Sequence, residues 1–200
     1  PNLIQNPIAV YAALRAGLVV VNTNPLYTER EMKHQFTDSG ATALVILSDL
    51  LPKFDAIKSD TQIKTVVATS ATELLDAATA PAITGTVSLT DAIKAGADLP
   101  GVVRPKTEFE SLAMLQYTGG TTGVSKGAAL SHKNVMSNSV QMLDHLGGFF
   151  KEGEEVVVCP LPLYHIYAFT VCMMALFAKG SHIVLIPNPR DIDGFIQTLK

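Results

Sequence analysis

One glycine- and hydroxyl-rich stretch constrains this chain more than any other part of its sequence. Residues 117–127 read Tyr-Thr-Gly-Gly-Thr-Thr-Gly-Val-Ser-Lys-Gly and hold four glycines, three threonines, one serine and one lysine. The apolar run 112–116 before it predicts a buried strand, and Ser131 after it is a good N-cap for a helix. We therefore predict a loop that leaves the end of a strand.

The residue types of this loop suit a polyanion. Glycines let the backbone come close to a ligand, and successive backbone N–H groups can form a concave nest for phosphate oxygens. Threonine hydroxyls add donors, and a lysine adds a mobile positive charge. The pattern predicts a phosphate-binding loop whose contacts come from Thr118, Gly119, Gly120, Thr121, Thr122, Gly123 and Lys126.

The loop has two other interpretations, a Walker A loop and a solvated turn. A Walker A loop needs Gly-Lys-Ser/Thr, whereas Lys126 is followed by Gly127. A nucleotide-hydrolysing protein of that class also needs a later apolar strand ending in aspartate, and the run 155–159 ends in Cys-Pro. On composition alone, a solvated turn in a hairpin stays open.

Short apolar runs alternate with helical patterns along most of the chain. This alternation predicts an α/β fold, a layered αβα arrangement with a mainly parallel sheet. Ligands of such sheets bind at the carboxyl ends of strands, which places loop 117–127 and the turn after residue 159 in one crevice. The expected strands are 18–21, 43–47, 65–68, 112–116, 155–159 and 183–186.

Local signals give the helix boundaries. Thr28 and Glu31 match a capping box, so a helix should begin at Glu29 and end at Gly40. A first helix should end at Gly17 and bury one face, made of Ile4, Ile8, Tyr11 and Leu14. A later helix should bury a face made of Val135, Ser139, Met142, Leu143 and Leu146. A buried helix is expected over 166–177.

The weaker signals fall in the middle of the chain. Ser48 or Asp49 should cap a short helix that has Pro52 in its first turn. Residues 69–101 are expected to be a surface excursion with one short helix, 91–95, capped by Thr90. Otherwise we expect residues 1–200 to form a single domain.

Composition narrows the functional classes. The net charge of −3 argues against a nucleic-acid surface. Cys159 and Cys172 lie in apolar runs and are predicted to be buried free thiols, as in a reducing cytoplasm. The longest apolar run, 166–178, is shorter than a membrane span, and no leader signal is evident. The chain starts without methionine and stops inside a helical pattern, so we expect a piece of a longer protein.

His165 is the second candidate for chemistry. It follows Pro160 and Pro162, which stiffen the turn, and it precedes an apolar helix whose N-terminus favours an anion nearby. A hydrogen-bonded core histidine is the alternative. The other four histidines have no such setting, and none shows zinc-ligand spacing with a second histidine or a cysteine, so no metal site is predicted: His34, His132, His145 and His182.

These motifs resemble those of the adenylate-forming superfamily. Thr-Gly-Gly-Thr-Thr-Gly-x-x-Lys-Gly is similar to its phosphate-binding signature, and Pro-Leu-Tyr-His-Ile at 162–166 to its histidine motif. Glycine at position 119, where most members have serine, is most similar to bacterial long-chain fatty-acid–CoA ligases. Residues 24–28 and 189–191 also resemble stretches of those ligases, and we expect the former to be structural.

The resemblance implies a piece of the large N-terminal adenylation domain, without the small C-terminal domain. It implies activation of a long-chain fatty acid with ATP, Mg²⁺ and coenzyme A, to acyl-AMP and then acyl-CoA. Lys126 would hold the β- and γ-phosphates, and His165 would position the fatty carboxylate. Another ligase of the superfamily, for a medium-chain or aryl acid, and a phosphate-binding fragment without turnover are the alternatives. We expect a cytoplasmic protein without nucleic-acid partners; contact with the inner membrane and a homodimer are left open.

Overall fold

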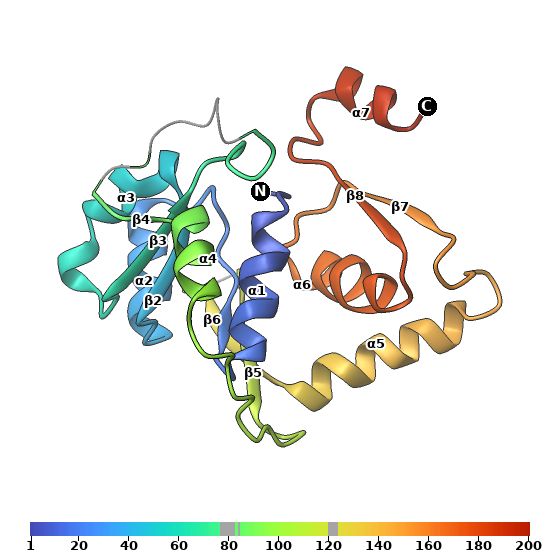
Figure 1. The fold of residues 1–200 in the computed structure, drawn as a ribbon, viewed down its shortest axis with the longest axis horizontal. Coiled ribbons are helices and arrows are strands. Elements are labelled where there is room, and N and C mark those ends of the chain that lie inside the picture. The colour runs from blue at the N-terminus through green and yellow to red at the C-terminus, as the bar shows by residue number, and fades with distance from the viewer. Residues whose placement is uncertain (77–82, 84, 120–123) are drawn as a thin grey trace. The chain divides into compact units, whose positions relative to one another are not determined.

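The computed structural model describes residues 1–76, 83, 85–119 and 124–200 of the chain (Figure 1). The chain falls into two compact units, and each is treated by itself. The first unit comprises Pro1–Asn22, Pro105–Thr118 and Ala128–Lys200, and the second comprises Thr23–Arg104 and Gly119–Gly127. Whether the chain acts as a single domain stays a prediction.

The first unit contains the N-terminal helix, the strand before the glycine-rich loop and everything after that loop. Its elements are α1 (Gln5–Arg15), β1 (Val20–Val21), β5 (Leu112–Thr118), most of β6 (Lys126–Ser131), α5 (His132–Leu146), β7 (Val156–Cys159), α6 (Ile166–Ala168), η3 (Phe169–Leu176), β8 (His182–Leu185) and α7 (Ile192–Thr198).

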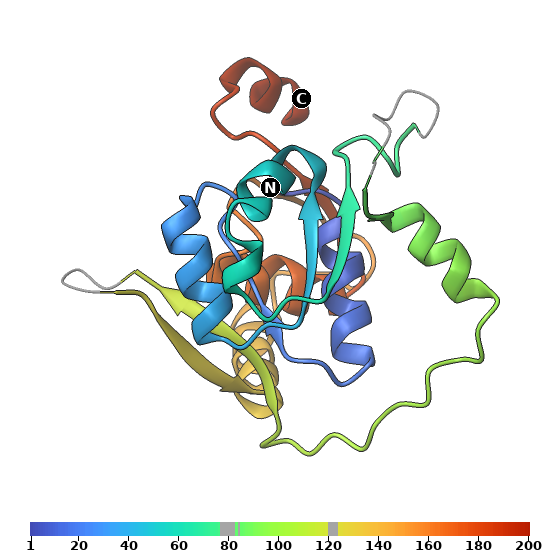
Figure 2. The same cartoon turned by 90° about the vertical axis from the view of Figure 1, so that its left-hand side faces the viewer.

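The second unit is a smaller α/β layer. Its elements are α2 (Glu29–Asp38), β2 (Ala43–Leu47), η1 (Ser48–Leu50), α3 (Leu51–Asp55), η2 (Lys58–Asp60), β3 (Thr65–Thr69), β4 (Val87–Ser88) and α4 (Leu89–Ala97). In Figure 2, β2 and β3 lie side by side, with α2 and α3 packed beside them.

The strands form three small sheets, in the orders β1-β5-β6, β2-β3-β4 and β7-β8. The pairs β1–β5, β2–β3, β3–β4 and β7–β8 are all parallel. The predicted α/β class with parallel pairing is thus confirmed, although the strands are divided among separate sheets. Strand β4 was not predicted, because two residues are too few to show an alternating pattern.

The predicted N-caps of α2 and α5 are confirmed. The Thr28 hydroxyl accepts a hydrogen bond from the Glu31 N–H (3.3 Å), and the Glu31 carboxylate accepts one from the Thr28 N–H (2.8 Å). These two bonds satisfy N–H groups that the first turn of a helix leaves free. Ser131 caps α5 in the same way with Asn134, and Gly40 takes a positive φ of 64° just past α2.

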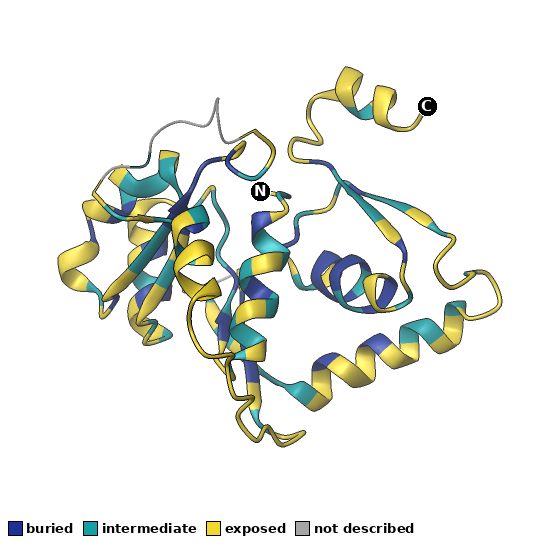
Figure 3. Cartoon of the chain, in the orientation of Figure 1, coloured by how far each residue is buried: buried dark blue, intermediate teal, exposed yellow. Residues whose placement is uncertain are grey.

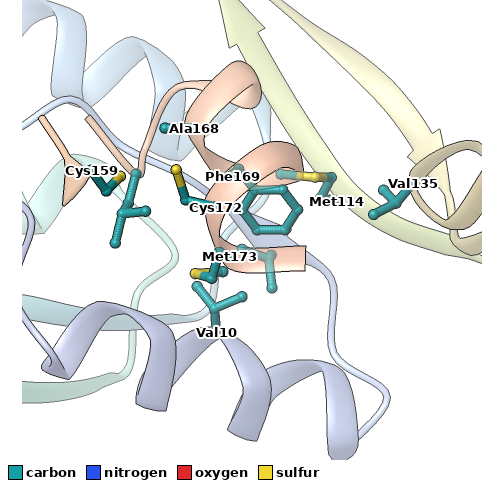
Figure 4. Close-up of a cluster of buried hydrophobic side chains, with 10 residues drawn as sticks. Val10, Met114, Val135, Cys159, Ala168, Phe169, Cys172 and Met173 are labelled. Carbon is teal, nitrogen blue, oxygen red and sulfur yellow. The ribbon is translucent and has the colours of Figure 1, made fainter. Parts of the chain in front are cut away.

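Each unit has its own hydrophobic core. In the first unit, η3 is the most deeply buried helix (Figure 3), and Phe169 lies between Cys172 and Met114 with Val10 and Met173 nearby (Figure 4). In the second unit, Phe36 meets Phe54 edge to face, with ring centroids 6.2 Å apart, beside the buried Met32. Burying such side chains stabilises each unit by roughly 1.5–3 kcal/mol per residue.

Other predictions were only partly right. Val135 and Ser139 are buried on α5 as expected, but Ile4, the N-cap of α1, and Ile8 on α1 are exposed. Instead, α1 turns Gln5 and Val10 inward, while Tyr11 and Leu14 pack at the edge of the core. The helix expected over 166–177 exists, but most of it, η3, is a π-helix.

The middle of the chain differs more. A 3-10 turn, η1, precedes α3, so neither Ser48 nor Asp49 makes a capping bond to α3. Ser88 rather than Thr90 caps α4, accepting from the Asp91 N–H at 3.0 Å. Residues 77–82 and 84 of the expected excursion lie outside the described residues.

Glu73 joins two segments of that excursion. Its carboxylate is nearly buried and accepts a hydrogen bond from the Thr90 N–H (2.8 Å) in the first turn of α4. Burial opposes ionisation, but hydrogen bonds from Thr69 and Thr90 together outweigh it and lower the pKa of Glu73. The charged carboxylate therefore helps to fix the start of α4.

No helix in the described part of the chain is long and apolar enough to cross a membrane.

Gly17 is the most constrained glycine for which the surroundings are described. It has φ +74°, and a Cβ at this position would lie 2.3 Å from Cγ of Pro105. Gly40 has a similar φ of +64° but open space around it, and Gly96 in α4 has open space and an ordinary φ. These three positions separate backbone strain from steric clash.

We predict a graded response to alanine at these glycines. Gly17→Ala should lower the free energy of unfolding by about 3 kcal/mol or more, from strain and clash together. Gly40→Ala should cost about 1 kcal/mol from strain alone, and Gly96→Ala should stabilise by up to about 1 kcal/mol. Urea denaturation of the three variants measures this, and equal costs at Gly17 and Gly40 would contradict the Pro105 contact.

Candidate functional site

The glycine-rich loop begins where β5 ends, as predicted. Thr118 is the last residue of β5, and Gly119 follows it; both are exposed. No described atom lies within 4 Å of a Cβ built on Gly119, so a serine would fit in its place. Four of the predicted contacts lie outside the described residues: Gly120, Thr121, Thr122 and Gly123.

Lys126 is the first residue of β6, and its side chain is exposed. Among the described residues, no carboxylate forms an ion pair with it. Lys133 makes a useful contrast, because its ammonium group is 2.7 Å from the Glu110 carboxylate. Contact with Glu110 raises the pKa of Lys133. Lys126 is thus a free positive charge, the kind of group that attracts an anionic ligand.

His165 is exposed and serves as the N-cap of α6. Its Nδ1 accepts a hydrogen bond from the Tyr167 N–H at 3.3 Å, so in the neutral ring the proton is on Nε2. This arrangement excludes the core-histidine alternative. It leaves an Nε2–H donor that can reach an anionic oxygen from a fixed ring.

The buried side chain of Asn2 holds the turn before His165. Its Nδ2 donates to the carbonyl oxygens of Cys159 (3.0 Å) and Leu161 (2.9 Å), and its Oδ1 accepts from the Leu163 N–H (2.8 Å). The residue is only 3% exposed. One amide thus bonds two backbone groups of the turn, which has no strand partner of its own, and the carbonyl at the end of β7.

Gln116 links the end of β5 to the same turn. Its Nε2 donates to the Tyr164 carbonyl at 3.3 Å and to the Tyr117 carbonyl at 3.4 Å, and the side chain is 6% exposed. Tyr164 directly precedes His165. Within the first unit, therefore, β5, the strand before the glycine-rich loop, directly contacts the histidine turn. The prediction of one shared crevice requires these two segments to lie close together.

Two free thiols lie on the elements before and after the histidine turn. Cys159 ends β7, Cys172 lies on η3, and both are buried and unbridged, as predicted. Contact with the Cys172 thiol and burial raise the pKa of Cys159. A protonated, buried thiol is a poor nucleophile, so we assign Cys159 to packing rather than to chemistry.

A small apolar cavity of about 50 Å³ lies in the first unit, lined by residues that include Met114, His132, Val135 and Phe169. It is far below the roughly 300–1,000 Å³ of a typical ligand pocket. No group of three histidine, cysteine or acidic side chains in the described residues could hold a metal ion.

The comparison with known families decides the broad assignment. A family described as "AMP-binding enzyme" matches residues 1–200, the whole chain. The chain belongs to the AMP-binding enzyme family. The resemblance noted from its sequence motifs is thereby confirmed.

Individual relatives are consistent with this family. The long-chain-fatty-acid–CoA ligase of Salmonella typhimurium is 40% identical over all of this AMP-binding chain but only 38% of its own length. The ligase of the same name from Bacillus subtilis is 32% identical, covering 94% of this chain and 36% of the relative. The chain thus spans well under half the length of the curated relatives it matches.

Solved structures show the same fold. ATP-bound MatB from Rhodopseudomonas palustris is 30% identical with a TM-score of 0.73, and covers 92% of this chain and 33% of MatB. A long-chain-fatty-acid–CoA ligase from Archaeoglobus fulgidus is 26% identical with a TM-score of 0.75, covering 94% of this chain and 34% of that protein.

Sequence reasoning missed three side chains of this AMP-binding chain. Asn2 was passed over because its partners are 157–161 residues away, and nothing in its local sequence indicates them. Gln116 entered the prediction only as the last residue of the apolar run 112–116. No role was predicted for His34, yet its ring contacts the carbonyl oxygen of Ser125 in the glycine-rich loop.

We predict that Asn2→Ala lowers the free energy of unfolding by about 2–3 kcal/mol. Roughly 1 kcal/mol comes from each of the lost bonds to the Leu161 carbonyl and the Leu163 N–H, and less from the Cys159 carbonyl, which keeps the Ile186 N–H as a partner. The matched control is Asn188→Ala, because Asn188 accepts one exposed bond from the Arg190 N–H. That control should change stability by less than about 0.5 kcal/mol. Similar losses in the two variants, measured by urea denaturation, would show that the Asn2 bonds are not important.

Proposed function

We propose that this chain carries the phosphate-binding and carboxylate-positioning parts of an enzyme that converts a long-chain fatty acid to its coenzyme A thioester with ATP. The family match over residues 1–200 and 40% identity to a long-chain-fatty-acid–CoA ligase support this proposal. The single observation that carries the chemistry is the exposed Lys126, which forms no ion pair with a described carboxylate, at the end of a glycine- and threonine-rich loop.

The first step joins two anions. A carboxylate oxygen of the fatty acid attacks the α-phosphorus of ATP, the bond to the β-phosphate oxygen breaks, and acyl-AMP and pyrophosphate result. Lys126, with the hydroxyl and backbone donors of residues 118–123, holds the β- and γ-phosphates and stabilises the charge that builds on the leaving pyrophosphate. The His165 Nε2–H donates to the carboxylate and fixes its direction of attack.

In the second step the thiol sulfur of coenzyme A attacks the acyl carbon and gives up its proton to solvent, the bond between the acyl carbon and the phosphate oxygen breaks, and AMP leaves with the bonding electrons. Magnesium neutralises phosphate charge in reactions of this kind. Its acidic ligand, the adenine contacts and the coenzyme A contacts are expected outside these 200 residues. The acyl-chain preference, the membrane contact, the homodimer and the cytoplasmic location stay predictions.

Lys126→Ala tests the phosphate-binding role. One charge about 4 Å from a phosphate offers roughly 4 kcal/mol at an effective dielectric constant near 20, before the cost of desolvation. We expect fatty-acid-dependent ATP–pyrophosphate exchange by the protein at its natural length to slow at least about 100-fold. Lys133→Ala, which removes an exposed lysine paired with Glu110, is the control and should leave exchange within about twofold. Near wild-type exchange in Lys126→Ala would exclude this role.

A second, non-catalytic function is favoured for the 200-residue chain alone, because it covers 38% of the length of its relative. We expect this chain to bind ATP or pyrophosphate without forming acyl-AMP. Calorimetry and an acyl-AMP assay on the chain check both parts. Turnover by the chain alone would mean that the groups expected outside these 200 residues are not essential.

A further inference from the structure

His34 on α2 contacts residue 125, in the described part of the glycine-rich loop. Its Nε2 lies 2.9 Å from the carbonyl oxygen of Ser125, and both residues are half-buried. A carbonyl oxygen can only accept a hydrogen bond, so Nε2 must carry the proton. The contact joins positions 91 residues apart in the sequence.

The helix that carries His34 is held in place by its N-cap and by buried side chains. Its N-terminus is closed by the Thr28–Glu31 capping box, and Met32 and Phe36, on either side of His34, are 2% and 3% exposed. Lys33 next to it forms an ion pair with Asp60 (2.7 Å). The ring of His34 is therefore attached to a helix whose own position is fixed by packing.

The other end of the contact lies beside the functional cation. Ser125 directly precedes Lys126, the first residue of β6. A lysine side chain has a flexible four-carbon stem, and ordering it on a ligand costs rotamer entropy. A fixed backbone before Lys126 limits the positions that its ammonium group can occupy, which lowers that cost.

We propose that His34 is a positioning residue for phosphate binding: its Nε2–H holds the Ser125 carbonyl and thereby sets where Lys126 meets the β- and γ-phosphates. This inference rests on the proposed function of Lys126. Because His34 acts through the backbone and does not touch the reacting atoms, its removal weakens the hold on pyrophosphate and leaves the chemical step largely intact.

The test compares two amide variants of the protein at its natural length. Glutamine can place its side-chain N–H₂ near the position of the imidazole Nε2, whereas asparagine is too short to reach it. His34→Asn should raise the KM for pyrophosphate in ATP–pyrophosphate exchange about three- to tenfold, the range expected for one hydrogen bond, with kcat within about twofold. His34→Gln should stay within about twofold of the wild type in both constants.

Thr28→Ala is the stability control, because it removes the cap of the same helix without touching Ser125. It should lower the melting temperature and leave the KM for pyrophosphate unchanged. The inference is overturned if Thr28→Ala and His34→Asn raise KM alike, if His34→Gln is as impaired as His34→Asn, or if His34→Asn leaves KM at the wild-type value.

These outcomes are distinct from failure of the proposed function. Two results would overturn the phosphate-binding role and the His34 inference together. One is a wild-type protein without fatty-acid-dependent exchange, and the other is an exchange rate that Lys126→Ala does not change. Exchange that depends on Lys126 but not on His34 overturns only the inference.

Discussion

The amide of Asn2 is the interaction on which the histidine side of the site depends. A turn built around two prolines cannot join a sheet, because proline lacks the N–H that a ladder needs. Its remaining backbone groups must therefore find partners elsewhere or stay exposed to water. Asn2 supplies two such bonds and a third to the end of β7 from one buried side chain, and Gln116 adds a bond to the Tyr164 carbonyl. The backbone before His165 is thus held by polar groups of other segments, while the ring itself accepts the Tyr167 N–H.

Features that depend on a few neighbouring residues could be predicted from the sequence. The start of α2 at Glu29 follows from Thr28 and Glu31 alone, because the bonds that fix it are made within three residues. A strand before the glycine-rich loop was predicted from its apolar run, although β5 continues to Thr118, two residues past the expected end. The α/β class and the membership of the AMP-binding enzyme family were indicated by patterns and motifs of the same short length.

Features that depend on distant contacts could not be predicted. The helical spacing of Ile4, Ile8, Tyr11 and Leu14 indicated α1 correctly but not the direction of its buried face, which follows from what packs against it. The sequence around His34 gives no sign that Ser125 lies against its ring. The loop residues 120–123 lie outside the described residues, so their contacts stay predictions.

The π-helix η3 has a consequence for the spacing between His165 and the strand that follows. A π-helix has more residues per turn than an α-helix, so each residue advances the chain by less than about 100° around the axis. If Phe169–Leu176 formed a regular α-helix of the same length, the buried Cys172 and Met173 would point in another direction and every later residue would be rotated further. The direction in which the chain leaves for β8 therefore depends on the type of helix as well as on the number of residues.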